Sequence, residues 1–223
     1  MTASSLTLTA ADGHTFSAYL AHPTGTPRGA VVVVQEIFGV NSHVRAVADG
    51  YAADGYLAIA PALFDRVERN VELGYSADDI ARGRTLKDAS GIDKPLLDVA
   101  AAVAHVRHAG RIGIVGYCWG GLLSWLAACE LNGLAASLPY YGGGVPGQAA
   151  RKPRCPVMAH FGERDAHIPL ATVKDFHRAQ PGITVHIYAA DHGFNCDQRG
   201  SFDAPSAALA RARSLAFLRE HVG

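Results

Sequence analysis

The chain has 223 residues, of which 49% are hydrophobic and 18% are charged, and its 20 basic and 20 acidic residues give a formal net charge of zero. This composition suits a globular α/β domain with a large core, and it excludes a disordered chain or one that binds nucleic acid through a basic surface. No apolar run is long enough to span a bilayer and no secretory signal is visible, so a membrane is not an expected partner.

In chain order, the residue pattern predicts a hairpin followed by alternating strands and helices. Residues 6–9 and 16–20 alternate in polarity on either side of Asp12-Gly13, which is typical of an antiparallel hairpin. Apolar runs predict strands at residues 30–34, 57–60, 111–115, 134–138, 156–160 and 184–188. Spacing and composition predict helices at about residues 42–54, 94–108, 122–129, 170–179 and 204–222. The charged segment 63–91 is predicted to be a partly helical excursion beside the site.

This alternation predicts a single domain over residues 1–223, built on a mainly parallel sheet with helices on both faces. Ligand sites in such sheets lie beyond the carboxyl ends of the strands. Polar or reactive side chains follow several predicted strands, namely Glu36, Cys118, Tyr140, Asp165 and His192. We therefore expect these side chains to meet at one edge of the sheet.

Residues 116–120, Gly-Tyr-Cys-Trp-Gly, have the form of the G-x-S-x-G nucleophile elbow, with Cys118 in place of the serine. A predicted strand precedes the motif and a predicted helix follows it, so the thiol should project from a tight turn over a helix N-terminus. The positive end of a helix favours thiolate over thiol. The alternative is a glycine-rich turn that holds an inert, buried cysteine.

A cysteine nucleophile needs a base to take its proton and a third group to orient that base. His192 follows the last predicted strand and Asp165 follows the strand before it, so the order Cys118, Asp165, His192 is that of α/β-hydrolases. Asp191 is a lesser candidate for the acid, because a residue that adjoins the histidine reaches its ring with difficulty. Taken singly, His192 is also consistent with a surface histidine and Asp165 with a helix cap or loop turn.

An oxyanion hole needs two backbone N–H groups aimed at one point. In this pattern Trp119, the residue after the nucleophile, supplies one, and Ile37 in the loop after strand 30–34 supplies the other. The side chains of Trp119 and Phe38 are expected in the core or the pocket wall. No metal site is predicted, because the sequence has no H-E-x-x-H motif and no cysteine–histidine set with zinc spacing. The four cysteines show no C-x-x-C pair and are interpreted as free thiols in a reducing, cytoplasmic compartment.

Several motifs resemble those of the dienelactone hydrolase family: Gln35–Gly39, Gly116–Gly121, Tyr140–Gly142, Gly162–Asp165 and His192–Phe194. The resemblance implies an α/β-hydrolase fold, no cofactor, and Cys118 as nucleophile, His192 as base and Asp165 as orienting acid. It also implies that Glu36 contacts the thiol and helps to deprotonate it once substrate binds. The namesake of the family opens the lactone ring of dienelactone to give maleylacetate, and two arginines hold the substrate carboxylate.

Arg199 matches one of these arginines and either Arg82 or Arg84 matches the other, while Tyr140 and Phe38 complete the expected substrate contacts. The predicted function is hydrolysis of a small, carboxylated lactone or ester through an acyl-enzyme, in a monomer or weak homodimer. Two alternatives stay open. One is a carboxylesterase or thioesterase for neutral substrates, and the other is a non-catalytic protein that binds a ligand or uses its thiol in redox chemistry.

Overall fold

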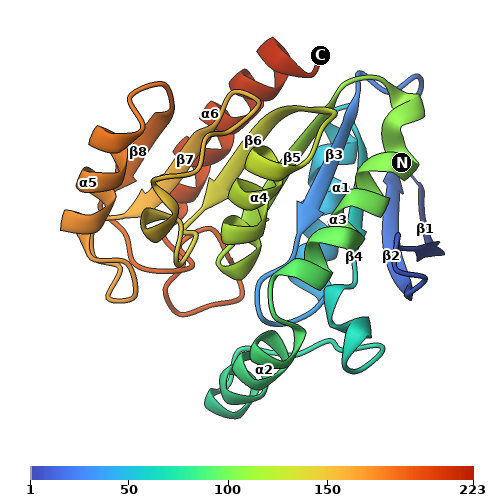
Figure 1. The fold of residues 1–223 in the computed structure, drawn as a ribbon, viewed down its shortest axis with the longest axis horizontal. Coiled ribbons are helices and arrows are strands. Elements are labelled where there is room, and N and C mark those ends of the chain that lie inside the picture. The colour runs from blue at the N-terminus through green and yellow to red at the C-terminus, as the bar shows by residue number, and fades with distance from the viewer. Residues whose placement is uncertain (1) are drawn as a thin grey trace.

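A mostly parallel, eight-stranded sheet forms the centre of the computed structural model, which describes residues 2–223 (Figure 1). The strand order across the sheet is β1-β2-β4-β3-β5-β6-β7-β8. β1 (Thr2–Thr9) and β2 (Thr15–His22) form the predicted antiparallel hairpin, and β2 also pairs antiparallel with β4 (Leu57–Pro61). The hairpin therefore extends one edge of the sheet.

The remaining strand pairs are parallel. Their strands are β3 (Ala30–Val34), β4, β5 (Ile112–Tyr117), β6 (Leu134–Tyr140), β7 (Met158–Gly162) and β8 (Thr184–Tyr188). Every residue of β3, β4 and β5 is buried, as continuous apolar runs predict for strands covered on both faces. β7 begins two residues later than predicted, because Pro156 has no N–H to donate and Val157 makes only an isolated bridge to Ser137.

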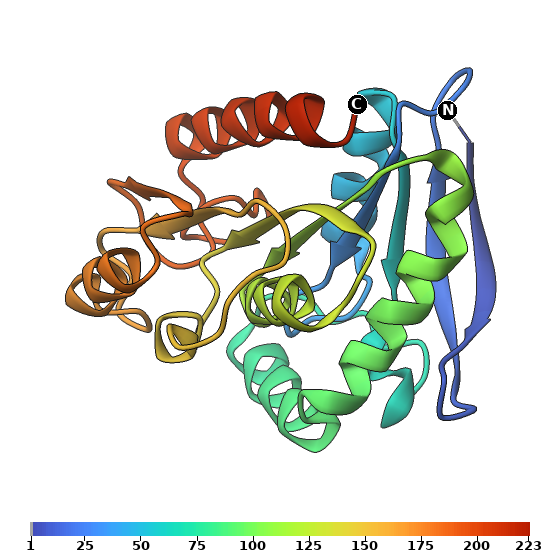
Figure 2. The same cartoon turned by 45° about the horizontal axis from the view of Figure 1, so that its top comes forward.

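Helices cover both faces of the sheet (Figure 2). α1 (Ser42–Ala53) and α6 (Ala204–His221) lie on one face, and α3 (Asp93–Val106), α4 (Trp119–Glu130) and α5 (Leu170–Ala179) lie on the other. On the second face, the ring of Phe176 in α5 packs edge-on against Trp125 in α4. The predicted arrangement of a mainly parallel sheet between two helical layers, with an N-terminal hairpin, is confirmed.

The excursion between β4 and α3 is partly helical, as predicted. It contains a short 3₁₀ helix, η1 (Leu63–Arg66), and α2 (Ala77–Ser90), which lies beyond the carboxyl ends of the parallel strands (Figure 1). A capping box fixes the start of α2: the Ser76 hydroxyl accepts the N–H of Asp79, and the Asp79 carboxylate accepts the N–H of Ser76. α2 is thereby held over the edge of the sheet where ligand sites form.

Two short 3₁₀ helices complete the fold, η2 (Arg107–Ala109) and η3 (Pro146–Gln148). η2 replaces the last turn of the helix predicted to run to residue 108. The chain then reverses at Gly110, whose φ of 115° suits a residue without a Cβ. Within residues 2–223, no helix combines the length and the apolar character needed to cross a membrane.

Candidate active site

Cys118 occupies a sharp turn between the end of β5 and the start of α4. Its backbone has φ 54° and ψ −116°, a conformation that residues with a Cβ rarely adopt. The flanking glycines make the turn feasible, because a Cβ at Gly116 would lie 1.9 Å from the carbonyl oxygen of Gly120. A Cβ at Gly120 would in turn lie 2.4 Å from the carbonyl oxygen of Gln35. β5 and α4 therefore meet backbone to backbone, with Cys118 at the carboxyl edge of the sheet.

His192 joins Cys118 to Asp165. Its Nε2 lies 3.2 Å from the Sγ of Cys118, and its Nδ1 lies 2.7 Å from the Oδ2 of Asp165. The other carboxylate oxygen of Asp165 accepts the backbone N–H of His167 at 2.8 Å, so both oxygens are held. His192 and Asp165 are buried, whereas Cys118 is partly exposed. The structure thus brings the three side chains into one hydrogen-bonded row.

These hydrogen bonds favour the protonated form of His192. Burial lowers the pKa of the imidazole, but the hydrogen bonds to Asp165 and Cys118 outweigh burial and raise the pKa from 6.5 to about 10. Asp191, the lesser candidate for the acid, accepts the backbone N–H of His192 at 2.7 Å. Asp191 therefore caps the turn, while Asp165 orients the ring.

A pocket of about 520 Å³ opens over the Cys118 thiol and the His192 ring. This volume lies within the usual range for small-molecule sites. Apolar side chains line it from Ile37, Phe38, Ile80, Ile92, Trp119 and Leu122, and charged side chains line it from Arg84, Lys87, Asp88 and Arg199. The wall can therefore hold a small organic molecule and contact an anionic group on it.

Two backbone amides of the pocket wall are free to donate to a ligand. They belong to Ile37, in the loop after β3, and to Trp119, at the first position of α4. Within residues 2–223, neither N–H has a hydrogen-bond acceptor. These are the two amides that the sequence pattern assigns to an oxyanion hole.

Glu36 is buried and pairs with Arg199, whose Nη1 lies 3.1 Å from the Oε1 of the carboxylate. The guanidinium also lies 5.6 Å from the centre of the Phe38 ring. Gly193 makes room for this arrangement, because a Cβ there would lie 2.5 Å from Nη1 of Arg199. In the part of the chain described, no hydrogen bond joins Glu36 to the Cys118 thiol. The contact implied by the family resemblance is therefore not formed here, because the arginine holds the carboxylate.

The structure shows which of Arg82 and Arg84, the two arginines of α2, lines the pocket. Arg84 lines the pocket together with Ile80, which lies one turn earlier on the same face of the helix. Arg82 lies outside the pocket wall, is half exposed and pairs with Glu68. Residues two apart point to different sides of a helix, so only one of these arginines can reach the pocket.

Tyr140 lies in the core and not in the pocket wall, which corrects its prediction as a substrate contact. Its side chain is fully buried, and its hydroxyl lies 2.6 Å from the Oγ of Ser214 in α6. The side chain thus leaves β6 on the face covered by α6. The backbone of Tyr140 still supports the elbow, because its carbonyl accepts the N–H of Cys118 at 3.0 Å.

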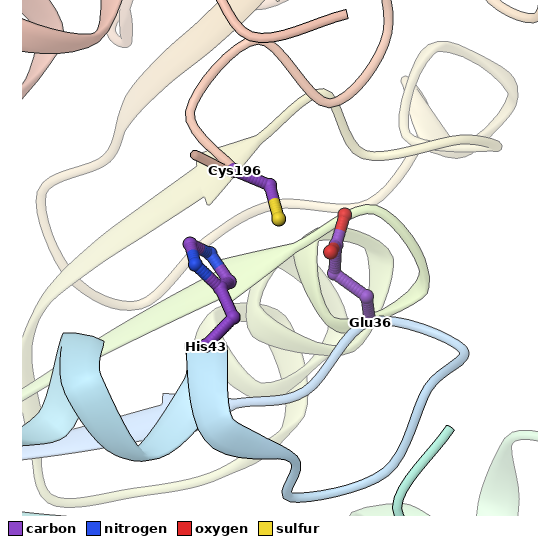
Figure 3. A group of neighbouring side chains, drawn as sticks. All are labelled: Glu36, His43 and Cys196. Atoms are coloured by element: carbon purple, nitrogen blue, oxygen red, sulfur yellow. The ribbon is translucent and has the colours of Figure 1, made fainter. Parts of the chain in front are cut away.

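Sequence reasoning missed two further features. The first is His167, which lines the pocket with its ring edge-on to His192 at a centroid distance of 5.2 Å. Its only sequence signal is its place two residues after Asp165. The second is a buried group of Glu36, His43 and Cys196, whose ligand atoms all lie within 4.8 Å of one another and could hold a metal ion (Figure 3). Three distant segments assemble this group, so no spacing rule reveals it.

Comparison with known proteins decides the family. The sequence profile of the "Dienelactone hydrolase family" matches residues 16–222, nearly the whole chain. The chain belongs to the dienelactone hydrolase family. It is 37% identical over 213 residues to a "Putative carboxymethylenebutenolidase" of Synechocystis sp., with 86% of each chain covered. It is also 33% identical over 219 residues to the carboxymethylenebutenolidase of Pseudomonas putida, which covers 93% of this chain and 92% of that protein.

Solved structures agree with this assignment to the dienelactone hydrolase family. The crystal structure of a "Putative Dienelactone Hydrolase" from Klebsiella pneumoniae superposes with a TM-score of 0.83 at 30% sequence identity. The match covers 99% of this chain and 100% of that one. The predicted family and α/β-hydrolase fold are therefore confirmed, and the chain is a hydrolase of this family.

Proposed function

We propose that this dienelactone hydrolase family member cleaves a small lactone or ester that carries a carboxylate, with Cys118 as nucleophile. The main support for the proposal is the pair of contacts made by His192. One ring nitrogen lies 3.2 Å from the Cys118 sulfur, and the other lies 2.7 Å from the Asp165 carboxylate. Cys118 and His192 line a pocket of small-molecule size. The name of the Pseudomonas putida relative, carboxymethylenebutenolidase, describes the hydrolysis of a butenolide with a carboxyl-bearing substituent.

In the proposed first half-reaction, Glu36 takes the proton of the Cys118 thiol, and the thiolate attacks the carbonyl carbon beside the protonated His192. The raised pKa of His192 supports this step, because an imidazolium beside the sulfur stabilises the thiolate. The amides of Ile37 and Trp119 hold the developing oxyanion. The carbon–oxygen bond then breaks and His192 gives its proton to the leaving oxygen. In a lactone that oxygen stays attached through the acyl chain.

In the second half-reaction, water hydrolyses the thioester on Cys118. The neutral His192 takes a proton from the water as its oxygen attacks the acyl carbon. The carbon–sulfur bond breaks, the thiolate and the imidazolium are restored, and the acid product loses its own proton to solvent. Asp165 stabilises the imidazolium and keeps the ring in place.

Two arginines of the pocket wall support a carboxylated substrate. Arg199 and Arg84 both line the pocket, and a guanidinium can hold a carboxylate through two parallel hydrogen bonds. A substrate carboxylate at Arg199 would compete with Glu36 for the guanidinium. Glu36, once released, would be the group that takes the thiol proton when substrate is present. This order of events would keep the enzyme inactive until substrate arrives.

The test compares wild type and Cys118→Ala on a carboxylated lactone, a neutral aryl ester and an acyl thioester. We expect Cys118→Ala to lose kcat/KM by roughly 10³-fold or more. Mass spectrometry of wild type during turnover of a slow ester should find the acyl group on Cys118. The matched control is Cys155→Ala, since that thiol lies outside the pocket wall. Near-normal turnover by Cys118→Ala would overturn the proposal.

The same substrate panel tests the alternatives. The apolar side chains of the pocket wall favour a neutral-ester hydrolase as the second candidate, and a higher kcat/KM for the neutral ester would place it first. A redox role for Cys118 has less support. Cys129 on α4 is buried, and burial raises its pKa to about 11, so it is a poor resolving thiol.

A further inference from the structure

Glu36, His43 and Cys196 form a buried cluster of side chains of the types that can bind a metal. Glu36 comes from the loop after β3, His43 from the first turn of α1, and Cys196 from the loop between β8 and α6, and their polar atoms turn toward one another (Figure 3). All three side chains are buried. They supply one carboxylate oxygen, one imidazole nitrogen and one sulfur.

Two of the donor atoms lack any partner. The Oε2 of Glu36 and the Nε2 of His43 are fully buried, and within residues 2–223 neither has a hydrogen-bond partner. Glu36 is 1% exposed and His43 is 4% exposed. Leaving such buried groups unsatisfied destabilises the folded state, so a bound species that satisfies both would stabilise the fold.

The hydrogen bonds of Glu36 and His43 leave one donor atom of each side chain available. Arg199 occupies only the Oε1 of Glu36, so Oε2 is not used by the ion pair. The Nδ1 of His43 lies 3.0 Å from the Oδ1 of Asp197, which holds the ring and leaves Nε2 to face the group. A histidine that binds a metal through one nitrogen usually donates the other N–H to a carboxylate or carbonyl in this way.

We propose that Glu36, His43 and Cys196 bind one zinc ion. Sulfur, imidazole and carboxylate donors together suit this borderline-soft cation, and three protein ligands leave the fourth position of a tetrahedron to water. The donors lie within 4.8 Å of one another. A tetrahedral zinc site holds its donors about 3.3–3.8 Å apart, so small side-chain rotations complete the site. Binding replaces the proton of the Cys196 thiol, which leaves to solvent.

Zinc at this site would also inhibit the hydrolase, a consequence that rests on the proposed function of Glu36. A carboxylate bound to the metal cannot move to the Cys118 thiol. Zinc should therefore lower kcat/KM of wild type, and Cys196→Ser, measured against its own metal-free activity, should resist this loss. Equal inhibition of the two proteins would overturn this coupling.

The binding test uses cobalt(II), whose bond to a thiolate gives a charge-transfer band in the near ultraviolet. The host is Cys118→Ala, because Cys118 and His192 form a second pair of donors and the inactive protein reports binding alone. We expect a band that saturates at one cobalt per chain and disappears when zinc is added. Cys196→Ser in this host should abolish the band, and Cys155→Ser, the matched cysteine control, should retain it.

A second variant distinguishes a loss of metal binding from a loss of folding. Asp197→Asn changes a side chain that is 66% exposed, so the fold should be unaffected. It weakens the support of His43 and should lower cobalt affinity by about 10–100-fold. The proposal is overturned if the Cys118→Ala host gives no band, which would mean that the cluster binds no metal. A band that persists at full strength in Cys196→Ser would overturn it as well.

Discussion

A Cβ at Gly83 would lie 2.1 Å from the carbonyl oxygen of Ile37, so α2 and the loop after β3 touch backbone to backbone. Ile37 carries one of the amides of the proposed oxyanion hole. The position of this amide therefore depends on a glycine in the middle of a helix, where glycine costs about 0.8–1.0 kcal/mol of helix stability relative to alanine.

Gly83→Ala should impair both stability and catalysis despite its better helix propensity. The added methyl group must push α2 away from the loop, which moves the Ile37 amide. We expect a lower Tm and a loss in kcat/KM of about 10–100-fold, measured by thermal unfolding and ester hydrolysis. Gly182→Ala is the control, because a Cβ there meets nothing within 4 Å. Unchanged kinetics in Gly83→Ala would show that the amide tolerates displacement of the helix.

Asp165→Asn should lower the pKa of His192. In wild type the hydrogen bonds to Asp165 and Cys118 overcome burial and raise this pKa from 6.5 to about 10. The stabilising contribution of protonated His192 is thus fully present below pH 6.5 and is lost as pH rises through about 10. In the variant the contribution should be smaller, and its loss should be complete at a lower pH. NMR titration of the ring C–H resonance checks this, and an unmoved titration would show that Asp165 does not set the pKa.

Arg84→Gln and Arg82→Gln form a matched pair on α2. Arg84 lines the pocket, so its loss should reduce kcat/KM for a carboxylated lactone and leave a neutral ester nearly unaffected. A hydrogen bond to a charged group contributes about 1.5–3 kcal/mol, or roughly one to two decades in kcat/KM. Arg82 pairs with Glu68 at the surface, and its replacement should change neither substrate. Equal losses on both substrates for Arg84→Gln would assign it a structural role.

Tyr140→Phe should affect stability and leave turnover almost unchanged. The hydroxyl lies 2.6 Å from Ser214 Oγ in the core, and Ser214 retains a second partner in His160 Nε2 at 3.0 Å. Removing one such hydrogen bond costs about 0.5–1.5 kcal/mol. Chemical denaturation should show this loss, while kcat/KM stays within about twofold of wild type. A selective fall in kcat/KM would return Tyr140 to the substrate contacts.

Local patterns in the sequence located the strands and the elbow, because a strand buried on both faces must be apolar and the turn at Cys118 requires glycine around it. The position of Asp165 and His192 after later strands placed them at the same edge of the sheet. What a short pattern does not contain is the direction of a side chain. Tyr140 lies at the carboxyl end of a strand, yet its side chain points toward α6, and this depends on packing across the sheet.

The excursion shows a second limit of the sequence. Its weak periodicity gave no helical register, so Arg82 and Arg84 were equivalent until the contact of α2 with Ile37 fixed the rotation of the helix. The sequence does not reveal the group of Glu36, His43 and Cys196 for a similar reason, because tertiary packing alone brings its three segments together.

The contact between Cys118 and His192 spans 74 residues of sequence, and this separation sets an order in time. A ribosome that adds about 5–20 residues per second makes the elbow several seconds before it makes the histidine. During that interval the ring of His192 has not yet been made, so the thiol lacks this partner. β7 and β8 must then join the sheet before Asp165 and His192 can meet the thiol. Each new molecule therefore forms the contact between Cys118 and His192 only after the chain has been made as far as residue 192.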